Sequence, residues 1–116
     1  MGKKILVGIK EPKKEVKFVE IEDDYKTMQK VVGGRLDVIT NVDDKLIDCW
    51  VNDDFLGEAS DDNLNVVFHS RRTVVFKNCF FASTDGEGNT VSLSSAQQEW
   101  VKSFCKKNDA YIKAMM

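Results

Sequence analysis

The fold is decided by residues 73–95, TVVFKNCFFASTDGEGNTVSLSS, where a long β-prone run leads into a glycine-rich turn and the start of a helix. Valine and phenylalanine dominate Thr73–Ser83 and the shorter run Val66–Phe68 that precedes it. Because apolar residues occupy both faces of these runs, the pattern predicts a buried central pair of strands.

The turn Asp85–Asn89 carries two glycines, which tolerate the backbone conformations that tight turns require.

A helix is predicted after this turn. Ser94 with Gln97, or Ser95 with Gln98, has the spacing of a capping box, in which each side chain accepts a hydrogen bond from the other residue's backbone N–H. Apolar residues then follow on one broad face and lysines lie mostly elsewhere: Trp100, Val101, Phe104, Cys105 and Ile112 against Lys102, Lys106, Lys107 and Lys113. This distribution is typical of an amphipathic helix that packs on a sheet.

The N-terminal part predicts a hairpin followed by a short helix. Alternating apolar residues indicate a strand at Lys4–Lys10, Pro12 interrupts the ladder, and Glu15–Ile21 returns as a second strand. A carboxylate of Asp23–Asp24 can cap a helix that ends at the glycine pair 33–34. Further strands are expected at Arg35–Thr40, at Lys45–Val51, around Phe55–Gly57 and at Asn65–His69.

These elements place the chain in the α+β class. We expect a mainly antiparallel sheet of five to seven strands, with a short internal helix and a C-terminal amphipathic helix that packs on the sheet. At 116 residues, the default organisation is a single domain spanning residues 1–116.

Charge and cysteine content exclude several functional classes. The net charge of −2 lacks the basic footprint of a general nucleic-acid binder. The three cysteines are far apart and only one histidine is present, so zinc-ligand spacing is absent and we expect neither a metal nor another cofactor. No apolar run is long enough to span a bilayer, so no membrane partner is expected, and the odd cysteine count favours a reducing cytoplasm.

No catalytic constellation is visible in the sequence. His69 stands beside Ser70 at a predicted strand end, and residues adjacent in sequence rarely reach the geometry of a nucleophile and its base. The glycine pair 33–34 follows a helix rather than a strand and lacks the lysine of a phosphate loop. We therefore expect a binding protein rather than an enzyme, with no catalytic residues.

Three features offer binding chemistry instead. Arg71 and Arg72 lie between two predicted strands, where a turn would display guanidinium groups that take phosphate oxygens bidentately; the alternative is a solvated turn. Phe80 and Phe81 point to opposite faces of one strand, so one ring is expected in the core and the other at a surface where a base stacks, unless both are buried. Asn89 could read a base or ribose edge, or simply tolerate a left-handed turn.

Several features occur together in a known family. They are the strand Lys3–Ile9, the turn at Pro12, the helix end Val31–Gly34, and the turn Asp85–Asn89 followed by Ser92–Ser94. In this order they resemble a small family of phage and prophage proteins classed as a domain of unknown function (number 3846), and the likeness covers most of the chain. Within such phage proteins, the chain also resembles the first-type Thoeris anti-defence sponge proteins in length, strand-rich body and terminal helix.

The resemblance to the sponges implies a non-enzymatic function in the cytoplasm of a bacterial host. Sponges of this type bind glycocyclic ADP-ribose, the signal made by the TIR-domain enzyme of Thoeris immunity, and hold it intact; cyclic oligonucleotides are a further ligand class to consider. Because the family sites lie between subunits, the resemblance also implies a homo-oligomer.

The family site maps onto a few positions of this chain. Phe80 or Phe81 would be the ring that stacks on adenine, and the Asn89 amide would form hydrogen bonds with the edge of the base or ribose. Lys106 or Lys107 lies on the terminal helix at the position where the family favours arginine. The ammonium group of lysine is a compact charge, whereas the planar guanidinium of arginine can also stack on a ring. The arginine pair described above is added from charge alone and not from the resemblance.

Two other functions stay open from the residues alone. The segment Asn41–Asp62 has eight acidic residues against one base, and it could dock on a basic surface of a host or defence protein and inhibit that protein. A weak hydrolase for a small nucleotide is the third hypothesis and ranks last.

Overall fold

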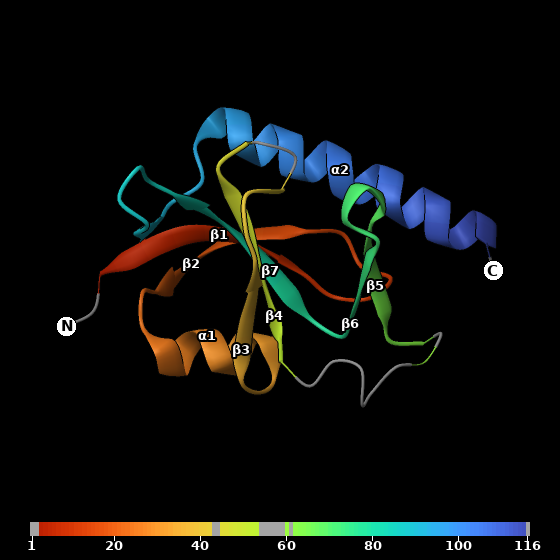
Figure 1. Cartoon of the computed structure of the whole chain (residues 1–116), viewed down its shortest axis with the longest axis horizontal. Coiled ribbons are helices and arrows are strands. Elements are labelled where there is room, and N and C mark those ends of the chain that lie inside the picture. The colour runs from red at the N-terminus through yellow and green to blue at the C-terminus, as the bar shows by residue number, and fades with distance from the viewer. Residues whose placement is uncertain (1–2, 43–44, 54–59, 61, 116) are drawn as a thin grey trace.

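The computed structural model describes residues 3–42, 45–53, 60 and 62–115, and within them a sheet is flanked by two α-helices (Figure 1). The strands are β1 (Lys4–Lys10), β2 (Lys17–Glu22), β3 (Leu36–Ile39), β4 (Ile47–Asn52), β5 (Leu64–Phe68), β6 (Thr73–Phe76), β7 (Cys79–Thr84) and β8 (Thr90–Val91). The α-helices are α1 (Tyr25–Val32) and α2 (Ser95–Met115), and a short 3-10 turn, η3 (His69–Arg71), joins β5 to β6. The predicted α+β class is confirmed.

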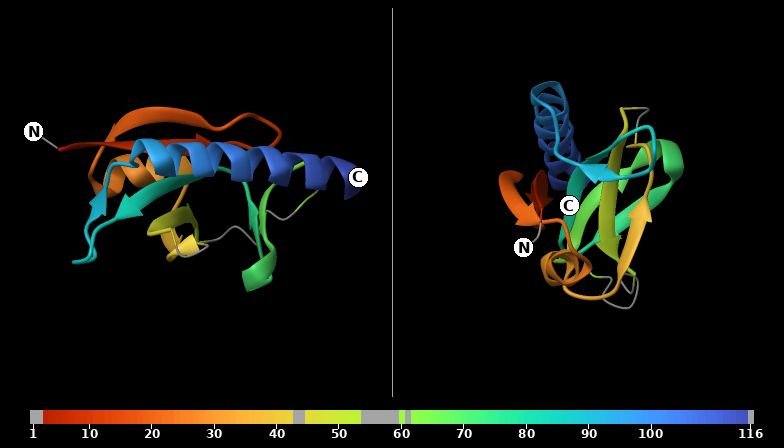
Figure 2. Two further views of the ribbon diagram at one scale, coloured as in Figure 1. Left: turned by 90° about the horizontal axis from the view of Figure 1, so that it is seen from above. Right: turned by 90° about the vertical axis from the view of Figure 1, so that its left-hand side faces the viewer.

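The main sheet has the strand order β2-β1-β7-β4-β3, with β8 paired to β7, and these pairings are all antiparallel. Strands β5 and β6 form a separate two-stranded sheet. The two α-helices lie on opposite sides of the main sheet, and the small sheet packs on the side that α2 covers (Figure 2). As a result β7 is covered on both faces and lies at the centre of the fold.

Local capping fixes α1 as the sequence predicts. The Asp24 carboxylate accepts a hydrogen bond from the Thr27 backbone N–H at 2.7 Å, and this bond lowers the pKa of Asp24. At the other end, Gly33 has a left-handed φ of 83°, and its N–H donates to the Gln29 carbonyl at 2.8 Å. The predicted β1–β2 hairpin is confirmed as well.

The predicted strand Thr73–Ser83 is interrupted, which corrects the expected central pair. Lys77 has a φ of 67° and donates its N–H to the Asn63 carbonyl at 2.7 Å, so the chain leaves the β conformation there. β6 therefore pairs with β5 in the small sheet, whereas β7 enters the main sheet. The prediction of a central strand is right for β7 and wrong for β5 and β6. The strand expected around Phe55–Gly57 lies outside the described residues.

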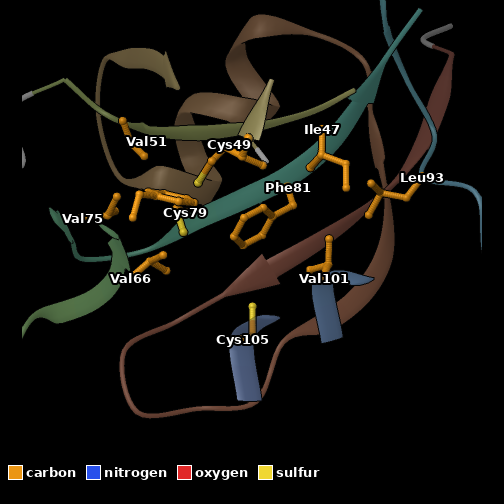
Figure 3. Packing of buried hydrophobic residues seen from close by; sticks show 12 residues of the cluster. Ile47, Cys49, Val51, Val66, Val75, Cys79, Phe81, Leu93, Val101 and Cys105 are labelled. Carbon is orange, nitrogen blue, oxygen red and sulfur yellow. The ribbon is translucent and has the colours of Figure 1, made fainter. Parts of the chain in front are cut away.

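Two apolar clusters fill the space on either side of the main sheet. On the α2 side, Phe81 packs among Cys49, Cys79, Val101 and Cys105 (Figure 3). On the α1 side, Phe80 packs against side chains from β1 and α1. Both phenylalanine rings are fully buried, because each face of β7 carries a helix over it.

The start of α2 is tied to the sheet by a capping box. The Gln97 N–H donates to Ser94 Oγ at 3.1 Å, and the Ser94 N–H donates to Gln97 Oε1 at 2.8 Å, so Ser94 rather than Ser95 is the cap. Gln97 Nε2 also donates to Ser83 Oγ on β7 at 2.9 Å. Among the helices of the described residues, none combines the length and the hydropathy that a bilayer span requires.

Candidate ligand-binding site

Three aromatic rings form a stacked ladder along one side of α2. Trp100 and Phe104 lie one helical turn apart, and their ring centroids are separated by 5.1 Å with an interplanar angle of 11°. Phe104 stacks in turn on Phe68, at the end of β5, with a centroid distance of 5.5 Å and an angle of 14°. Trp100 and Phe104 are only half-buried, so the ladder reaches the surface.

A pocket of about 240 Å³ opens beside this ladder, and we call it the aromatic pocket. Its lining residues are Phe68, His69, Ser70, Arg71, Trp100 and Phe104. Three of them come from η3, which turns the chain from β5 back into β6 next to α2 (Figure 1). The aromatic pocket therefore combines flat apolar rings from α2 with polar side chains from η3.

Arg71 is anchored at the aromatic pocket through one of its N–H donors. Its Nη2 donates to the Asn41 carbonyl at 2.9 Å, while the residue remains exposed. A guanidinium carries five N–H donors, so others stay available to a ligand. The prediction of Arg71 in a turn between strands is confirmed. Arg72 follows with a φ of 52°, is exposed, and is not one of the residues that line this pocket.

Phe80 and Phe81 offer no stacking surface in the single chain. Each ring is 0% exposed, Phe80 on the α1 side of the sheet and Phe81 on the α2 side. The expectation that one of the two rings faces outward is wrong, and the alternative that both are buried holds, because β7 is covered on both faces. At the aromatic pocket the partly accessible rings are those of Trp100 and Phe104, and two aromatic residues four positions apart in a predicted helix were the sequence signal for them.

Asn89 is engaged in its own turn. Its backbone N–H and its Nδ2 donate to the Asp85 carboxylate at 2.9 and 3.1 Å, and the Glu87 N–H donates to the same carboxylate at 2.8 Å. These bonds from Asn89 and Glu87 lower the pKa of Asp85. The turn lies at the opposite end of the molecule from η3 (Figure 1), so the structure does not bring Asn89 and Arg71 together.

Lys106 and Lys107 are exposed on α2 but do not line the aromatic pocket. Lys106 lines a different cavity of about 300 Å³, together with Glu15, Val16, Lys102, Cys105 and Asp109. The seven predicted site residues are thus spread over the core, two turns and α2. Arg71 is the one among them that meets accessible aromatic rings.

A buried polar network joins β1 to α2. The fully buried Lys10 donates from Nζ to the Glu11 carbonyl at 2.8 Å and to Asn65 Oδ1 at 3.1 Å, and it pairs with Asp109 Oδ1 at 3.1 Å. Asn108 completes the network by donating to the Asn65 carbonyl at 2.8 Å. Because its three N–H donors all have acceptors, Lys10 is placed for structure rather than for nucleophilic attack. The sequence, which shows Lys10 only as a strand end, gave no signal of this burial.

The three cysteines lie close to Phe81 in the core (Figure 3). Burial raises the pKa of the Cys105 thiol to about 12, and burial together with a hydrogen bond to Cys79 raises the pKa of Cys49 well above its ordinary value. These two thiols are therefore protonated at neutral pH and are poor nucleophiles. Within the described part of the chain, no group of three or more histidine, cysteine or acidic side chains is placed to hold a metal ion.

The acidic segment Asn41–Asp62 lies partly outside the described residues. Two of its carboxylates make ion pairs with other parts of the chain: Asp53 with Arg35 at 3.4 Å and Asp62 with Lys13 at 3.3 Å. Nothing in these contacts favours a protein-binding surface over an ordinary solvated one.

Comparison with known protein families gives one match, which covers most of the chain. The model of the family described as "Domain of unknown function (DUF3846)" matches residues 4–106. The chain belongs to this family. The matched segment contains every strand of the main sheet and all residues of the aromatic pocket, and it ends before Asp109. No curated protein and no solved structure matches the chain.

Proposed function

We propose that this DUF3846 protein is a phage anti-defence sponge, which binds a nucleotide signal and withholds it from its receptor without cleaving it. The proposed ligand is glycocyclic ADP-ribose, the signal of Thoeris immunity, and the proposed location is the cytoplasm of the bacterial host. The proposal rests on the resemblance to first-type Thoeris sponges and on one structural observation. That observation is the accessible Trp100–Phe104 stack with Arg71 beside it.

The aromatic pocket supplies the two kinds of contact that a nucleotide needs. A purine that stacks on the exposed side of the aromatic ladder gains about 1–3 kcal/mol. Each charge-assisted hydrogen bond from Arg71 to a phosphate oxygen adds about 1.5–3 kcal/mol, and a guanidinium can make two such bonds at once. A nanomolar Kd corresponds to about −12 kcal/mol, so several of these contacts must act together in a preformed pocket.

One chain provides only part of such a site. The aromatic pocket measures about 240 Å³, whereas pockets that enclose a small-molecule ligand commonly measure about 300–1,000 Å³. It has room for a base but not for the whole signal. We therefore include in the proposal a homo-oligomer in which a second copy covers the rest of the ligand, as the resemblance implies. Multi-angle light scattering that finds single chains with full binding capacity would contradict this part.

A sponge must also release its ligand unaltered. In the described residues, Lys10 has all three N–H donors engaged, and the Cys49 and Cys105 thiols are protonated and buried. These observations favour capture over covalent chemistry. They do not depend on which cyclic nucleotide is bound.

A capture-and-release assay tests the proposal. The protein is incubated with glycocyclic ADP-ribose, free ligand is measured in the filtrate, and the retained fraction is heated and analysed by chromatography. We expect depletion of the free ligand, followed by quantitative recovery of intact ligand after heating. Arg71→Ala is expected to weaken capture about tenfold or more, since a desolvated phosphate contact is lost. Arg35→Ala, which removes an exposed guanidinium that pairs with Asp53 and does not line the aromatic pocket, is the matched control and should bind normally.

Two results would contradict the proposal. A degraded ligand after heating would indicate a hydrolase, and a filtrate in which the ligand stays free would exclude the sponge function for this signal. Equal loss of capture in the Arg71 and Arg35 variants would instead show that the aromatic pocket is not the site.

A further inference from the structure

A further cavity lies on the other side of α2 from the aromatic pocket. It measures about 450 Å³ and is lined by Lys13, Leu64, Asp109, Ile112 and Lys113. At 100° per residue, Asp109 and Lys113 project from α2 roughly opposite to Trp100 and Phe104. We call this space the hairpin cavity, because Lys13 belongs to the β1–β2 turn. The smaller cavity that Lys106 lines shares Asp109 with it.

The Asp109 carboxylate is held in place at the wall of the hairpin cavity. Its Oδ1 pairs with Nζ of the fully buried Lys10 at 3.1 Å and accepts from Asn108 Nδ2 at 3.4 Å. The side chain of Asp109 is nevertheless 34% exposed. Because both contacts use Oδ1, the second oxygen is left as an acceptor for donors of a ligand. A pre-oriented carboxylate of this kind needs little ordering on binding.

The remaining lining residues give the hairpin cavity a positive character. Lys13 and Lys113 are its cations, and the charge of Asp109 is already balanced by Lys10. This contrasts with the chain as a whole, whose net charge is −2. Lys13 makes an ion pair with Asp62 at 3.3 Å, but both side chains are exposed, and such pairs are worth little, so Lys13 can turn to another anion. Leu64 and Ile112 add an apolar wall.

We propose that the hairpin cavity binds a phosphorylated sugar. The hydroxyl groups donate to Asp109, as ribose hydroxyls do to the carboxylates of nucleotide-binding folds, and the phosphate meets Lys13 and Lys113. The C–H face of the sugar lies against Leu64 and Ile112. Asp109, Ile112 and Lys113 lie beyond the family match of residues 4–106, whereas Lys13 and Leu64 lie within it, so the family segment supplies only part of this site. The site is independent of the aromatic pocket and of the function proposed there.

Calorimetric titration of the full chain tests the proposal with three probes: ribose 5-phosphate, inorganic phosphate and adenosine 5′-monophosphate. We expect ribose 5-phosphate to bind saturably and about tenfold more tightly than inorganic phosphate, since one or two hydrogen bonds to Asp109 are added. Lys13→Gln/Lys113→Gln should weaken binding about tenfold. The control pair Lys14→Gln/Lys26→Gln has the same net charge, and neither residue lines the hairpin cavity, so its affinity should be unchanged.

A further variant isolates the carboxylate. Asp109→Asn should remove the advantage of ribose 5-phosphate over inorganic phosphate without weakening phosphate binding, since the charge of Lys10 is then no longer balanced. If Asp109→Asn does not fold, the comparison of Lys13→Gln/Lys113→Gln with Lys14→Gln/Lys26→Gln still tests the proposal. Titration of the Arg71→Ala variant with adenosine 5′-monophosphate distinguishes two sources of the ligand. If this nucleotide binds, the cavity accepts the ribose phosphate of a nucleotide; if it does not bind, the ligand is a free sugar phosphate. Equal affinity for ribose 5-phosphate and inorganic phosphate, or equal loss in the two lysine pairs, would overturn the proposal.

Discussion

Lys10 and Asp109 form an ion pair of 3.1 Å that ties the first strand to the last helix. The Lys10 side chain is completely buried, and Asn65 and the Glu11 carbonyl accept its other two N–H donors. The network therefore holds α2 against β1 and β5. Because α2 forms one wall of the aromatic pocket and one wall of the hairpin cavity, this pair positions both sites.

Removal of Asp109 alone should destabilise the protein strongly. Asp109→Leu leaves a buried ammonium without its counter-charge, which is expected to lower the free energy of unfolding by about 3 kcal/mol. The double variant Lys10→Met/Asp109→Leu should recover part of that loss, since an ion pair replaced by apolar groups is often nearly neutral. Urea unfolding followed by circular dichroism measures both. A double variant less stable than Asp109→Leu would show that the two side chains are not coupled.

The capping box of α2 makes a separate prediction. Ser94→Ala removes the acceptor of the Gln97 N–H, and we expect a loss of about 1 kcal/mol in the free energy of unfolding. Ser95→Ala is the matched control, because Ser95 is exposed and already lies inside the helix, and its effect should be close to zero. Thermal melts of the two variants side by side measure the difference. Equal melting temperatures would assign the cap elsewhere.

The buried thiols should make the fold sensitive to alkaline pH. The folded-state pKa of Cys105 is about 12 against an ordinary value of 9.0, so the unfolded state loses its proton first as the pH rises. Stability contributed by the protonated thiol is complete below about pH 9 and falls by about 1.4 kcal/mol per pH unit above it, until the folded pKa is reached. Cys49, whose pKa is also raised, adds to the same trend.

Cys105→Ala isolates this effect. The variant should be less stable than the parent at pH 7, because a buried sulfur is lost, but the difference should shrink as the pH rises from 9 to 10.5. Urea midpoints across this range provide the measurement. A difference that stays constant with pH would contradict the raised pKa of Cys105.

The local signals in the sequence were enough for the helices and the first hairpin. Asp24 and Gly33 mark the ends of α1, and Ser94 with Gln97 marks the start of α2, because capping needs only neighbours in the chain. The break at Lys77 could not be read in this way. A lysine at a φ of 67° carries no sequence signature, and it is tertiary contact that separates β6 from β7.

The candidate site was less predictable than the fold. Arg71 could be selected from its place between two strands, but the rings beside it come from another part of the chain, Phe68 on β5 and Trp100 and Phe104 on α2. Phe80 was selected because a strand exposes alternate faces, and this reasoning fails when helices cover both faces. The aromatic pocket and the Lys10 network exist only once distant segments pack together.

Trp50→Phe should give a folded protein with Trp100 as its one remaining tryptophan. The indole Nε1 of Trp50 is buried, and in the described structure it has no hydrogen-bond partner, so the substitution loses no hydrogen bond. Its ring stacks on Phe80 at 6.1 Å, a contact that phenylalanine can retain in part. We expect a loss of less than about 2 kcal/mol in the free energy of unfolding, measured by urea titration. A larger loss would show that the indole itself is required.

The most direct test of the sponge proposal is a titration of this Trp50→Phe variant with glycocyclic ADP-ribose, followed through the emission of Trp100. Stacking of the purine on the accessible side of the half-buried Trp100 ring predicts a saturable change in fluorescence with a Kd near the nanomolar range. The same change should be weakened by Arg71→Ala and unaffected by Arg35→Ala. An unchanged Trp100 signal at ligand concentrations that saturate binding by calorimetry, or no binding at all, would contradict the account.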